Sequence, residues 1–328
     1  MRVLITGANG FLGARVVRAF KEAGIGVRAL VRPAARVQPQ GQGDEVEVFR
    51  ADLRGGEPLE AAFDGIDVLV HLAACVVGDD EERFFSTVVG TERLLAAMAR
   101  TETKKLVLAS TFSVYDWSEV RSVLDESSPL EADLYGRDGY AVAKAWQERV
   151  ARRDSAAHGF DLRVLRPGFI WGPGRTDLAG VGMRIGSVQL VFGMPSRRIP
   201  LTHVDNCASS FVLVATDDRA AGETYNVVDD EGVSAWRFAR DELRMRGERC
   251  LCVPIPYALA YGITRLARAT SRWIFGPGGK LPSILVPERF EARFKPLRFG
   301  NRKLREELGW APTLDYPDAL RASFDGRE

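Results

Sequence analysis

The sequence predicts an α/β protein in which a doubly wound parallel sheet is followed by a smaller C-terminal region. Three observations predict this fold class. The chain opens with a short apolar strand, a glycine-rich turn and an amphipathic helix within residues 2–23. Predicted strands and helices then alternate up to about residue 175. From about residue 177 the composition shifts toward Gly and Ala with few charges, which indicates a different region.

The opening turn is the stretch TGANGFLG, residues 6–13. It joins the apolar run 2–5 to a segment with helical spacing, so backbone N–H groups and a helix N-terminus converge there. Gly7 allows the tight turn, Gly10 lets a phosphate approach the backbone, and Gly13 lets helix and strand pack closely. The turn therefore predicts a Rossmann-type dinucleotide site. The expected cofactor contacts in it are Gly7, Asn9, Gly10, Phe11, Leu12 and Gly13.

Hydrophobic periodicity predicts the remaining elements. Strands are expected at residues 2–5, 27–31, 46–49, 67–71, 105–110, 162–165 and 224–227. Helices are expected at residues 11–23, 83–100, 138–158, 205–216 and 234–245. We expect a dinucleotide-binding domain over residues 1–175 and a substrate-binding region over residues 176–328. Residues 199–230 are expected to return partly to the sheet.

The residues after the second and third strands bear on the choice of dinucleotide. A dinucleotide fold usually places an acidic residue there, which binds the ribose 2′-hydroxyl. This chain has Arg32, with Arg36 nearby, and a guanidinium pairs with a 2′-phosphate that a carboxylate would repel. We therefore expect NADP in preference to NAD, the alternative being a solvated arginine that tolerates NAD. Asp52, before Leu53, either accepts a hydrogen bond from the adenine amino group or caps the strand end.

Two later segments predict catalytic chemistry. Tyr140 and Lys144 are four residues apart in a predicted helix, so both lie on one face. Thr111 follows a strand at the edge where ligands bind in open α/β sheets. We expect the Lys144 ammonium and the positive nicotinamide ring to lower the pKa of Tyr140, which would act as general acid or base. Thr111 would bind the substrate oxygen, and Lys144 would also hold the nicotinamide ribose. His71 is expected to be a packed core residue.

Composition limits the remaining function classes. The formal net charge is +1, which gives no global reason to expect nucleic acid as a partner. No apolar run is long enough to span a bilayer, and the first strand follows Met1 directly without a signal peptide, so we expect a cytoplasmic protein. The four cysteines lack metal-ligand spacing, and no metal is expected.

Taken together, these motifs resemble the extended short-chain dehydrogenase/reductase family, also called the NAD-dependent epimerase/dehydratase family, over nearly the whole chain. The matching segments are Thr6–Gly13 (TGxxGxxG), Asp52-Leu53, Leu72-Ala73-Ala74, Ser110–Tyr115 (SSxxVYG), Tyr140–Lys144 (YxxxK), Arg166-Pro167-Gly168 with Gly172-Pro173-Gly174 (RPxxxxGPG), His203–Asn206 (HVDN) and Asn301–Pro312. The resemblance implies that Leu72, Ala73 and Ala74 lie under the cofactor and that Pro167 and Gly168 belong to the segment over the nicotinamide. It assigns Thr111 the position of the catalytic Ser or Thr, and it implies a homodimer through helices 83–100 and 138–158.

Three positions depart from the family pattern. Asp116 stands where Gly is common, Ala143 where Ser or Thr is frequent, and Thr87 in place of the Asn of NxxGT. That Asn supports a proton-relay water in related enzymes, so Thr87 puts the relay in doubt.

The second half contains two segments with open alternatives. Residues 177–191 are expected to form a mobile substrate loop or a short helix. Residues 256–275 are mainly apolar, but Arg265, Arg268 and Arg272 recur at helical spacing and make one face basic. We favour a helix packed on the domain with a solvated arginine face. The alternative is a helix that rests on a membrane surface or lines a pocket for a hydrophobic substrate.

Three functions are weighed. The leading hypothesis is an oxidoreductase that passes hydride between NAD(P) and a carbonyl or secondary alcohol of a small substrate, for which a hydrophobic molecule is one option. The rival is a nucleotide-sugar epimerase or dehydratase with tightly bound NAD, in which Arg184, Arg197 and Arg198 would pair with a diphosphate rather than being surface charges. A non-catalytic dinucleotide sensor or scaffold is the third, and the complete Thr111, Tyr140 and Lys144 set argues against it.

Overall fold

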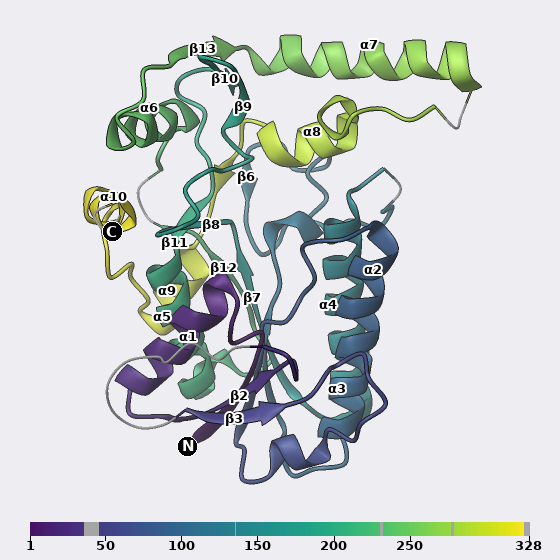
Figure 1. Ribbon diagram of the computed structural model, residues 1–328, viewed down its shortest axis with the longest axis vertical. Coiled ribbons are helices and arrows are strands. Elements are labelled where there is room, and N and C mark those ends of the chain that lie inside the picture. The colour runs from purple at the N-terminus through teal and green to yellow at the C-terminus, as the bar shows by residue number, and fades with distance from the viewer. Residues whose placement is uncertain (36–45, 135, 230–231, 277–278, 325–328) are drawn as a thin grey trace.

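A seven-stranded parallel sheet forms the centre of the structure, a computed structural model that describes residues 1–35, 46–134, 136–229, 232–276 and 279–324 (Figure 1). The strand order is β12-β7-β5-β4-β1-β2-β3, and every neighbouring pair is parallel. The strands are β1 (Arg2–Thr6), β2 (Gly26–Val31), β3 (Glu47–Arg50), β4 (Val68–His71), β5 (Lys105–Ala109), β7 (Asp161–Pro167) and β12 (Thr224–Val227). The predicted doubly wound fold is confirmed, and the predicted strand 224–227 joins the sheet at its edge.

Helices cover both faces of this sheet, because successive strand residues point to opposite sides. Val3 and Ile5 belong to one core cluster and Leu4 to the other. The first face carries α1 (Phe11–Glu22), α5 (Val204–Thr216) and α9 (Arg302–Leu308). The second face carries α3 (Gly90–Met98) and α4 (Gly139–His158), with α2 (Asp80–Phe84) packed beside α4 (Figure 1).

The helix predicted over residues 83–100 is present and contains a π-helical turn. The chain forms α2, then one π-helical turn, η2 (Phe85–Val89), and then α3. A wider π turn shifts the side chains that follow it relative to an α-helix, and such turns are frequent at functional sites.

The smaller region lies beyond the carboxyl ends of the central strands, at the top of Figure 1. It contains a three-stranded sheet of β9 (Gly182–Ile185), β10 (Val188–Phe192) and β13 (Leu251–Ile255). Its helices are α6 (Ala235–Met245), α7 (Tyr257–Phe275) and α8 (Pro287–Phe294). Two further pairs, β8 (Phe169–Trp171) with β11 (Leu201–His203) and β6 (Val123–Leu124) with β14 (Arg298–Phe299), link it to the central sheet. The expectation of a loop or short helix over residues 177–191 is wrong, because β9 and β10 pair as an antiparallel hairpin.

The last part of the chain returns to the central sheet. Leu304, Leu308 and Trp310 are buried in the cluster beneath β1 and β12, and Tyr225 of β12 donates a hydrogen bond to Glu307 of α9 (2.9 Å). The chain then continues into α10 (Tyr316–Phe324), which packs beside α6. Within the described residues, no helix combines the length and apolar character needed to cross a membrane.

Candidate active site

The glycine turn between β1 and α1 has the geometry of a phosphate-binding loop. Gly7 has a φ of +71°, a backbone conformation that would be strained in a residue with a side chain. The Gly10 N–H donates to the Gly7 carbonyl (2.9 Å). Gly10 begins α1 without a side-chain cap, and the first turn contains no acidic residue. Asn9 is exposed in the turn, whereas Leu12 packs against the core. Because the helix N-terminus is neither capped by a side chain nor screened by a carboxylate, the turn fits a dinucleotide pyrophosphate.

Gly13 is the position in this turn where a side chain is least tolerable. A Cβ there would lie 2.0 Å from the Gly7 carbonyl oxygen, so Gly13→Ala must push α1 away from the turn. We expect a loss of about 2–3 kcal/mol in the free energy of unfolding, and weaker cofactor binding. Chemical denaturation and titration of NADPH fluorescence measure both. Gly262→Ala is the matched control, because a Cβ added to that helical glycine would meet no neighbouring atom within 4 Å. The control is expected to be neutral or to stabilise by up to about 1 kcal/mol, and equal losses in both variants would contradict the argument.

The small residues after β4 lie directly against the glycine turn. A Cβ on Gly7 would approach the Ala73 backbone nitrogen to 2.9 Å, and Ala73 N–H donates to Thr6 Oγ1 (3.3 Å). Leu72, Ala73 and Ala74 are partly exposed beside the turn. His71 is 1% exposed, and burial together with the Lys144 charge lowers its pKa to about 3. His71 is therefore a neutral core residue, as predicted.

Arg32 lies exposed at the carboxyl end of β2, where the ribose edge of a dinucleotide is expected. The pKa of Asp52 is lowered mainly by a hydrogen bond with Arg54, and the positive charge of Arg32 contributes to the same lowering. Asp52 accepts from the Arg54 backbone N–H (2.9 Å) and from its guanidinium (3.0 and 3.2 Å), so it caps the turn after β3, and its contact with adenine stays a prediction. Leu53 packs against the core, and Arg36 lies outside the described residues.

The segment after β7 reaches α1 from the opposite side. Pro167 ends β7, and a Cβ on Gly168 would lie 2.2 Å from the Pro200 carbonyl oxygen, so only glycine fits there. A Cβ on Gly172 would meet the ring of Phe11 at 3.5 Å. Residues 167–172 thus extend from the carboxyl end of a central strand to the first residue of α1.

Tyr140 and Thr111 are brought together at the carboxyl end of β5. Tyr140 lies in the first turn of α4, where Asp138 caps the helix by accepting from Ala141 N–H (2.9 Å). The Thr111 hydroxyl and the Arg175 charge both lie close enough to the Tyr140 phenol to act on its pKa, and each lowers that pKa. The Arg175 guanidinium carbon is also 5.5 Å from the centroid of the Phe11 ring. Arg175, which the sequence analysis missed, therefore connects the predicted catalytic pair with the glycine turn. The signal was available, because Arg175 directly follows the GPG motif.

Lys144 is placed differently from the prediction. Its Nζ donates to the Ala109 carbonyl and to Gln147 Oε1 (2.5 Å), and burial lowers the pKa of Lys144 to about 7. Burial raises the pKa of Tyr140, and Arg175 and Thr111 oppose this rise without reversing it. The expectation that the Lys144 ammonium lowers the pKa of Tyr140 is therefore wrong for this structure, because the ammonium is held inside the protein by other acceptors.

Gln147 is a second residue that the sequence analysis missed. Its Nε2 donates to the Ala73 carbonyl (3.0 Å) and to Thr91 Oγ1 (3.0 Å), while its Oε1 accepts from Lys144. It thus joins the helix that carries Tyr140 to the small residues beside the glycine turn. Helical spacing could have found it, because Gln147 is three residues after Lys144 on the same face.

A buried ion pair supports the same helix from behind. Glu148 of α4 and Arg166 of β7 are each about 3% exposed and form paired hydrogen bonds, and Ser110 donates to Glu148 Oε2 (2.6 Å). Burial alone would raise the pKa of Glu148, but the bonds and charge of Arg166 lower it to about 2. Arg166 also donates to the Tyr115 hydroxyl (3.0 Å). Since Ser110 precedes Thr111, this pair fixes α4 against the strand end that carries Thr111.

Thr87 lies in the π turn and is engaged by the backbone. Its Oγ1 accepts from Cys75 N–H (2.9 Å), and its carbonyl accepts from the Thr91 hydroxyl (2.6 Å). Where the family has an amide side chain, this chain thus has a hydroxyl that holds the segment after Ala74.

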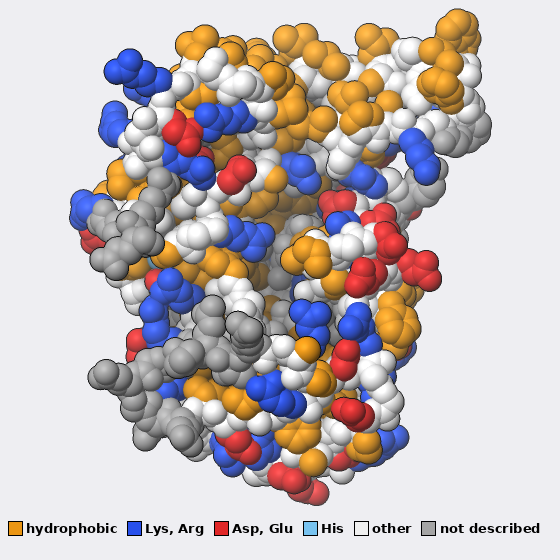
Figure 2. All heavy atoms as spheres, in the orientation of Figure 1, with side chains coloured by type: hydrophobic (Ala, Val, Ile, Leu, Met, Phe, Trp, Pro, Cys, Tyr) orange, Lys and Arg blue, Asp and Glu red, His pale blue; other side chains and the backbone are white. Residues whose placement is uncertain are grey.

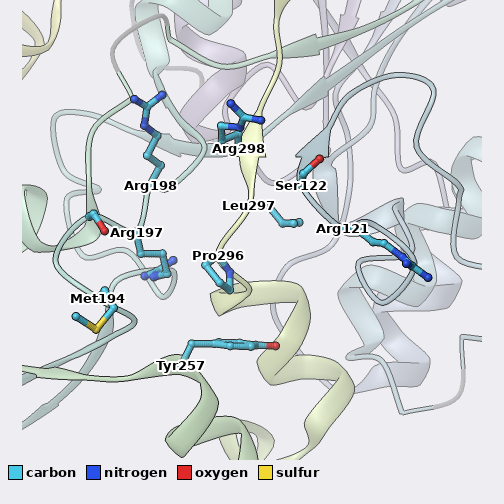
Figure 3. A pocket seen from close by; sticks show the side chains of 10 residues that line it. Arg121, Ser122, Met194, Arg197, Arg198, Tyr257, Pro296, Leu297 and Arg298 are labelled. Atoms are coloured by element: carbon cyan, nitrogen blue, oxygen red, sulfur yellow. The ribbon is translucent and has the colours of Figure 1, made fainter.

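A cavity of about 470 Å³ lies between the smaller region and the segment before β14 (Figure 3). Its wall includes Arg121, Arg198 and Arg298, and the described residues contain no carboxylate within ion-pair distance of these three side chains. Phe299, next to Arg298, packs on Phe112, next to Thr111, with ring centroids 6.0 Å apart. The cavity is therefore connected to the catalytic segment through packed aromatic residues.

The three arginines named for a diphosphate do not act together. Arg197 is buried and donates to the carbonyls of Phe192 (2.5 Å) and Gly180 (2.6 Å), so its role is structural. Arg184 pairs with Glu248. Only Arg198 lies exposed in the cavity wall (Figure 3).

Comparison with known proteins agrees with this architecture. The model of the NAD dependent epimerase/dehydratase family matches residues 3–227. A 3 beta-hydroxysteroid dehydrogenase/Delta 5-->4-isomerase of Mycobacterium tuberculosis is 28% identical, over 97% of this chain and 88% of that protein. A 4-hydroxy-2-methyl-3-oxo-4-farnesyl-3,4-dihydroquinoline-1-oxide ketoreductase of Stigmatella aurantiaca is 29% identical, over 98% of this chain and 95% of that protein. The structure of UDP-glucuronic acid 4-epimerase from Bacillus cereus with NAD superimposes with a TM-score of 0.72 at 20% identity, covering 99% and 96% of the two chains.

The fold and the site together define an NAD(P)-dependent enzyme of the extended short-chain dehydrogenase/reductase type. The chain belongs to the NAD dependent epimerase/dehydratase family. Its activity is therefore that of an oxidoreductase or epimerase, and the hypothesis of a non-catalytic sensor is set aside.

Proposed function

We propose that the protein transfers hydride between a nicotinamide cofactor and a carbonyl or secondary alcohol carbon of a hydrophobic substrate. The observation that carries this proposal is the proximity of Thr111 and Tyr140 at the carboxyl end of β5, connected by Arg175 to the glycine turn. The cofactor, when bound, supplies or accepts the hydride, and the chain's own residues handle the proton.

Tyr140 exchanges that proton. Because burial raises its pKa, the phenol is protonated near neutral pH and is ready to donate to a developing alkoxide. This protonation state favours the direction of carbonyl reduction. Thr111 holds the same substrate oxygen through its hydroxyl. Lys144, held by the Ala109 carbonyl and Gln147, is our candidate for the nicotinamide ribose.

We further propose NADP as the preferred dinucleotide. The exposed Arg32 is supported by a second cation, since Arg54 binds Asp52 at the same edge and offsets its negative charge. Arg54 is shared with Glu82, 3.9 Å away, so Arg32, which has no carboxylate within ion-pair distance among the described residues, is the cation available to a 2′-phosphate.

Charge reversal at Arg32 tests this preference. Arg32→Glu is expected to raise the KM for NADPH about tenfold or more, because the carboxylate repels the 2′-phosphate, and to change the KM for NADH by about threefold or less. Steady-state kinetics with both cofactors measure the two effects. Arg100→Glu, at an exposed arginine after α3, controls for the change in total charge. An equal rise in both KM values would contradict the assignment.

The relatives support a hydrophobic carbonyl substrate. They include, besides the steroid dehydrogenase and the farnesyl-bearing ketoreductase, a 2-alkyl-3-oxoalkanoate reductase of Shewanella oneidensis at 29% identity over 79% of this chain. The cavity wall contributes Met194, Tyr257 and Leu297 as apolar surface. A test incubates the protein with NADPH and a panel of steroid ketones, 2-alkyl-3-oxo acids and short ketones. Steady oxidation of NADPH with an apolar ketone supports the proposal, and none with any of them counts against it.

A nucleotide-sugar epimerase is the second candidate, and Arg198 and Arg298 favour it. Two guanidinium groups without a carboxylate in the same cavity wall are suited to a diphosphate. Incubation with UDP-sugars followed by a search for isomers distinguishes the two functions. Recovery of the purified protein with a stoichiometric, tightly held NAD would favour epimerisation over net redox.

A further inference from the structure

Helix α7 is turned so that its small residues face the protein. Only Ala260, Thr264 and Ser271 are buried along its 19 residues. They recur at four and seven positions and form one narrow stripe on the helix. The favoured expectation, a helix packed on the domain with exposed arginines, describes how α7 contacts α8, although most of its large aliphatic side chains are not in that contact. The helix contacts α8 through this stripe and through Tyr257 and Tyr261, and it leaves its large aliphatic side chains and Trp273 outside.

The outer face of α7 is apolar and exposed. Trp273 is 87% exposed, Leu266 68%, Leu259 58%, Ile274 55% and Ile263 50%. At 100° per residue these five side chains cover a sector of about 100°, which begins beside the buried stripe and extends to the opposite side of the helix. Scattered exposed apolar residues are normal, but a contiguous set of large ones on one helix marks an interaction surface. Figure 2 shows the same feature as hydrophobic side chains along the edge formed by α7 and β13.

A basic flank borders this apolar face. Arg265 and Arg272 are exposed, and neither has a carboxylate within ion-pair distance among the described residues, whereas Arg268 pairs with Glu288 of α8. The cations project from the side of the helix, between the buried stripe and the apolar face. An apolar face with unneutralised arginines on its border complements a surface that is apolar within and anionic at its boundary.

We propose that α7 binds the interface of an anionic lipid bilayer, with its axis parallel to the surface. Leu259, Ile263, Leu266, Trp273 and Ile274 would enter the boundary between headgroups and acyl chains, and the basic flank would contact lipid phosphates. A second copy of the chain explains the surface less well, because it would bring more arginines rather than anions. Tyr257 begins α7 and also lines the cavity, so the bilayer would lie beside the cavity. This inference holds independently of the proposed redox activity.

Flotation with vesicles tests the proposal on the full-length protein. We expect binding to vesicles of phosphatidylcholine with one part in four phosphatidylglycerol, and about tenfold weaker binding to pure phosphatidylcholine. Leu266→Ser with Trp273→Ser should abolish binding, and Arg265→Glu with Arg272→Glu should reduce it about tenfold or more. Arg302→Glu with Arg321→Glu makes the same charge change at exposed arginines on α9 and α10, and should bind like the wild type apart from a small loss from total charge.

Trp273 also provides a direct readout that misfolding cannot imitate. Brominated lipids should quench part of the tryptophan fluorescence of the wild type, and Trp273→Phe should bind vesicles but lose that quenching. Failure of the wild type to float with any vesicle would overturn the proposal. Sedimentation that shows a dimer, lost in the Leu266 and Trp273 double variant, without vesicle binding would assign the face to a second copy instead.

Discussion

Replacing Tyr140 by phenylalanine is expected to reduce kcat for carbonyl reduction about 10³-fold, because the ring is retained while the proton donor is lost. The affinity for NADPH should stay within about twofold, since the phenol acts on the reacting oxygen rather than on cofactor binding. Single-turnover kinetics and fluorescence titration separate the two quantities.

The control for this variant is Tyr261→Phe in α7, whose hydroxyl makes only a long contact with Glu291 (3.5 Å). That variant should retain full activity. If Tyr140→Phe keeps more than about a tenth of the wild-type kcat, Tyr140 is not the proton donor and the proposed chemistry fails.

Replacing Glu148 by glutamine is expected to lower the free energy of unfolding by about 3–5 kcal/mol, because it leaves the buried Arg166 without its counter-charge. Glu306→Gln is the matched control, because that glutamate pairs with an arginine, Arg302, but is 65% exposed. The control should change stability by less than about 0.5 kcal/mol. Urea unfolding at neutral pH compares the stability of the wild type, Glu148→Gln and Glu306→Gln. Similar stabilities of all three would show that the ion pair of Glu148 and Arg166 is not essential.

The same pair predicts a pH dependence with a defined sign. The pKa of Glu148 is lowered from 4.5 to about 2, so its contribution to stability is complete above pH 4.5 and is lost as the pH falls toward 2. The difference in stability between wild type and Glu148→Gln should therefore shrink across that interval.

The sheet and the motif segments could be predicted because they depend on local pattern. Strand periodicity located β1 to β5, β7 and β12, and the TGxxGxxG, YxxxK and RPG motifs located the segments that the fold brings to the carboxyl ends of the strands. The motif alignment also placed Thr111 beside Tyr140, although the two are far apart in sequence.

The features that the sequence did not predict depend on contacts between segments that are distant in the chain. Lys144 donates hydrogen bonds to the buried Ala109 carbonyl and to Gln147. Helical spacing predicts which face Lys144 lies on, but it does not predict these acceptors. The hairpin of β9 and β10 belongs to a sheet that β13 completes by pairing with β10 from much later in the chain, so the local sequence pattern did not reveal it. For α7, the arginine spacing indicated an exposed basic face, but the sequence pattern did not show that Ala260, Thr264 and Ser271 are the residues buried on the protein side.

The return of α9 to the central sheet has a consequence for how the protein is made. Leu304, Leu308 and Trp310 close a hydrophobic cluster whose other members begin at Val3, so contacts at one end of the chain wait for residues at the other. Such distant contacts carry a high cost in loop closure and slow folding. During synthesis the nucleotide half therefore emerges with part of this cluster uncovered, and the cluster is completed only once Leu304, Leu308 and Trp310 have left the ribosome.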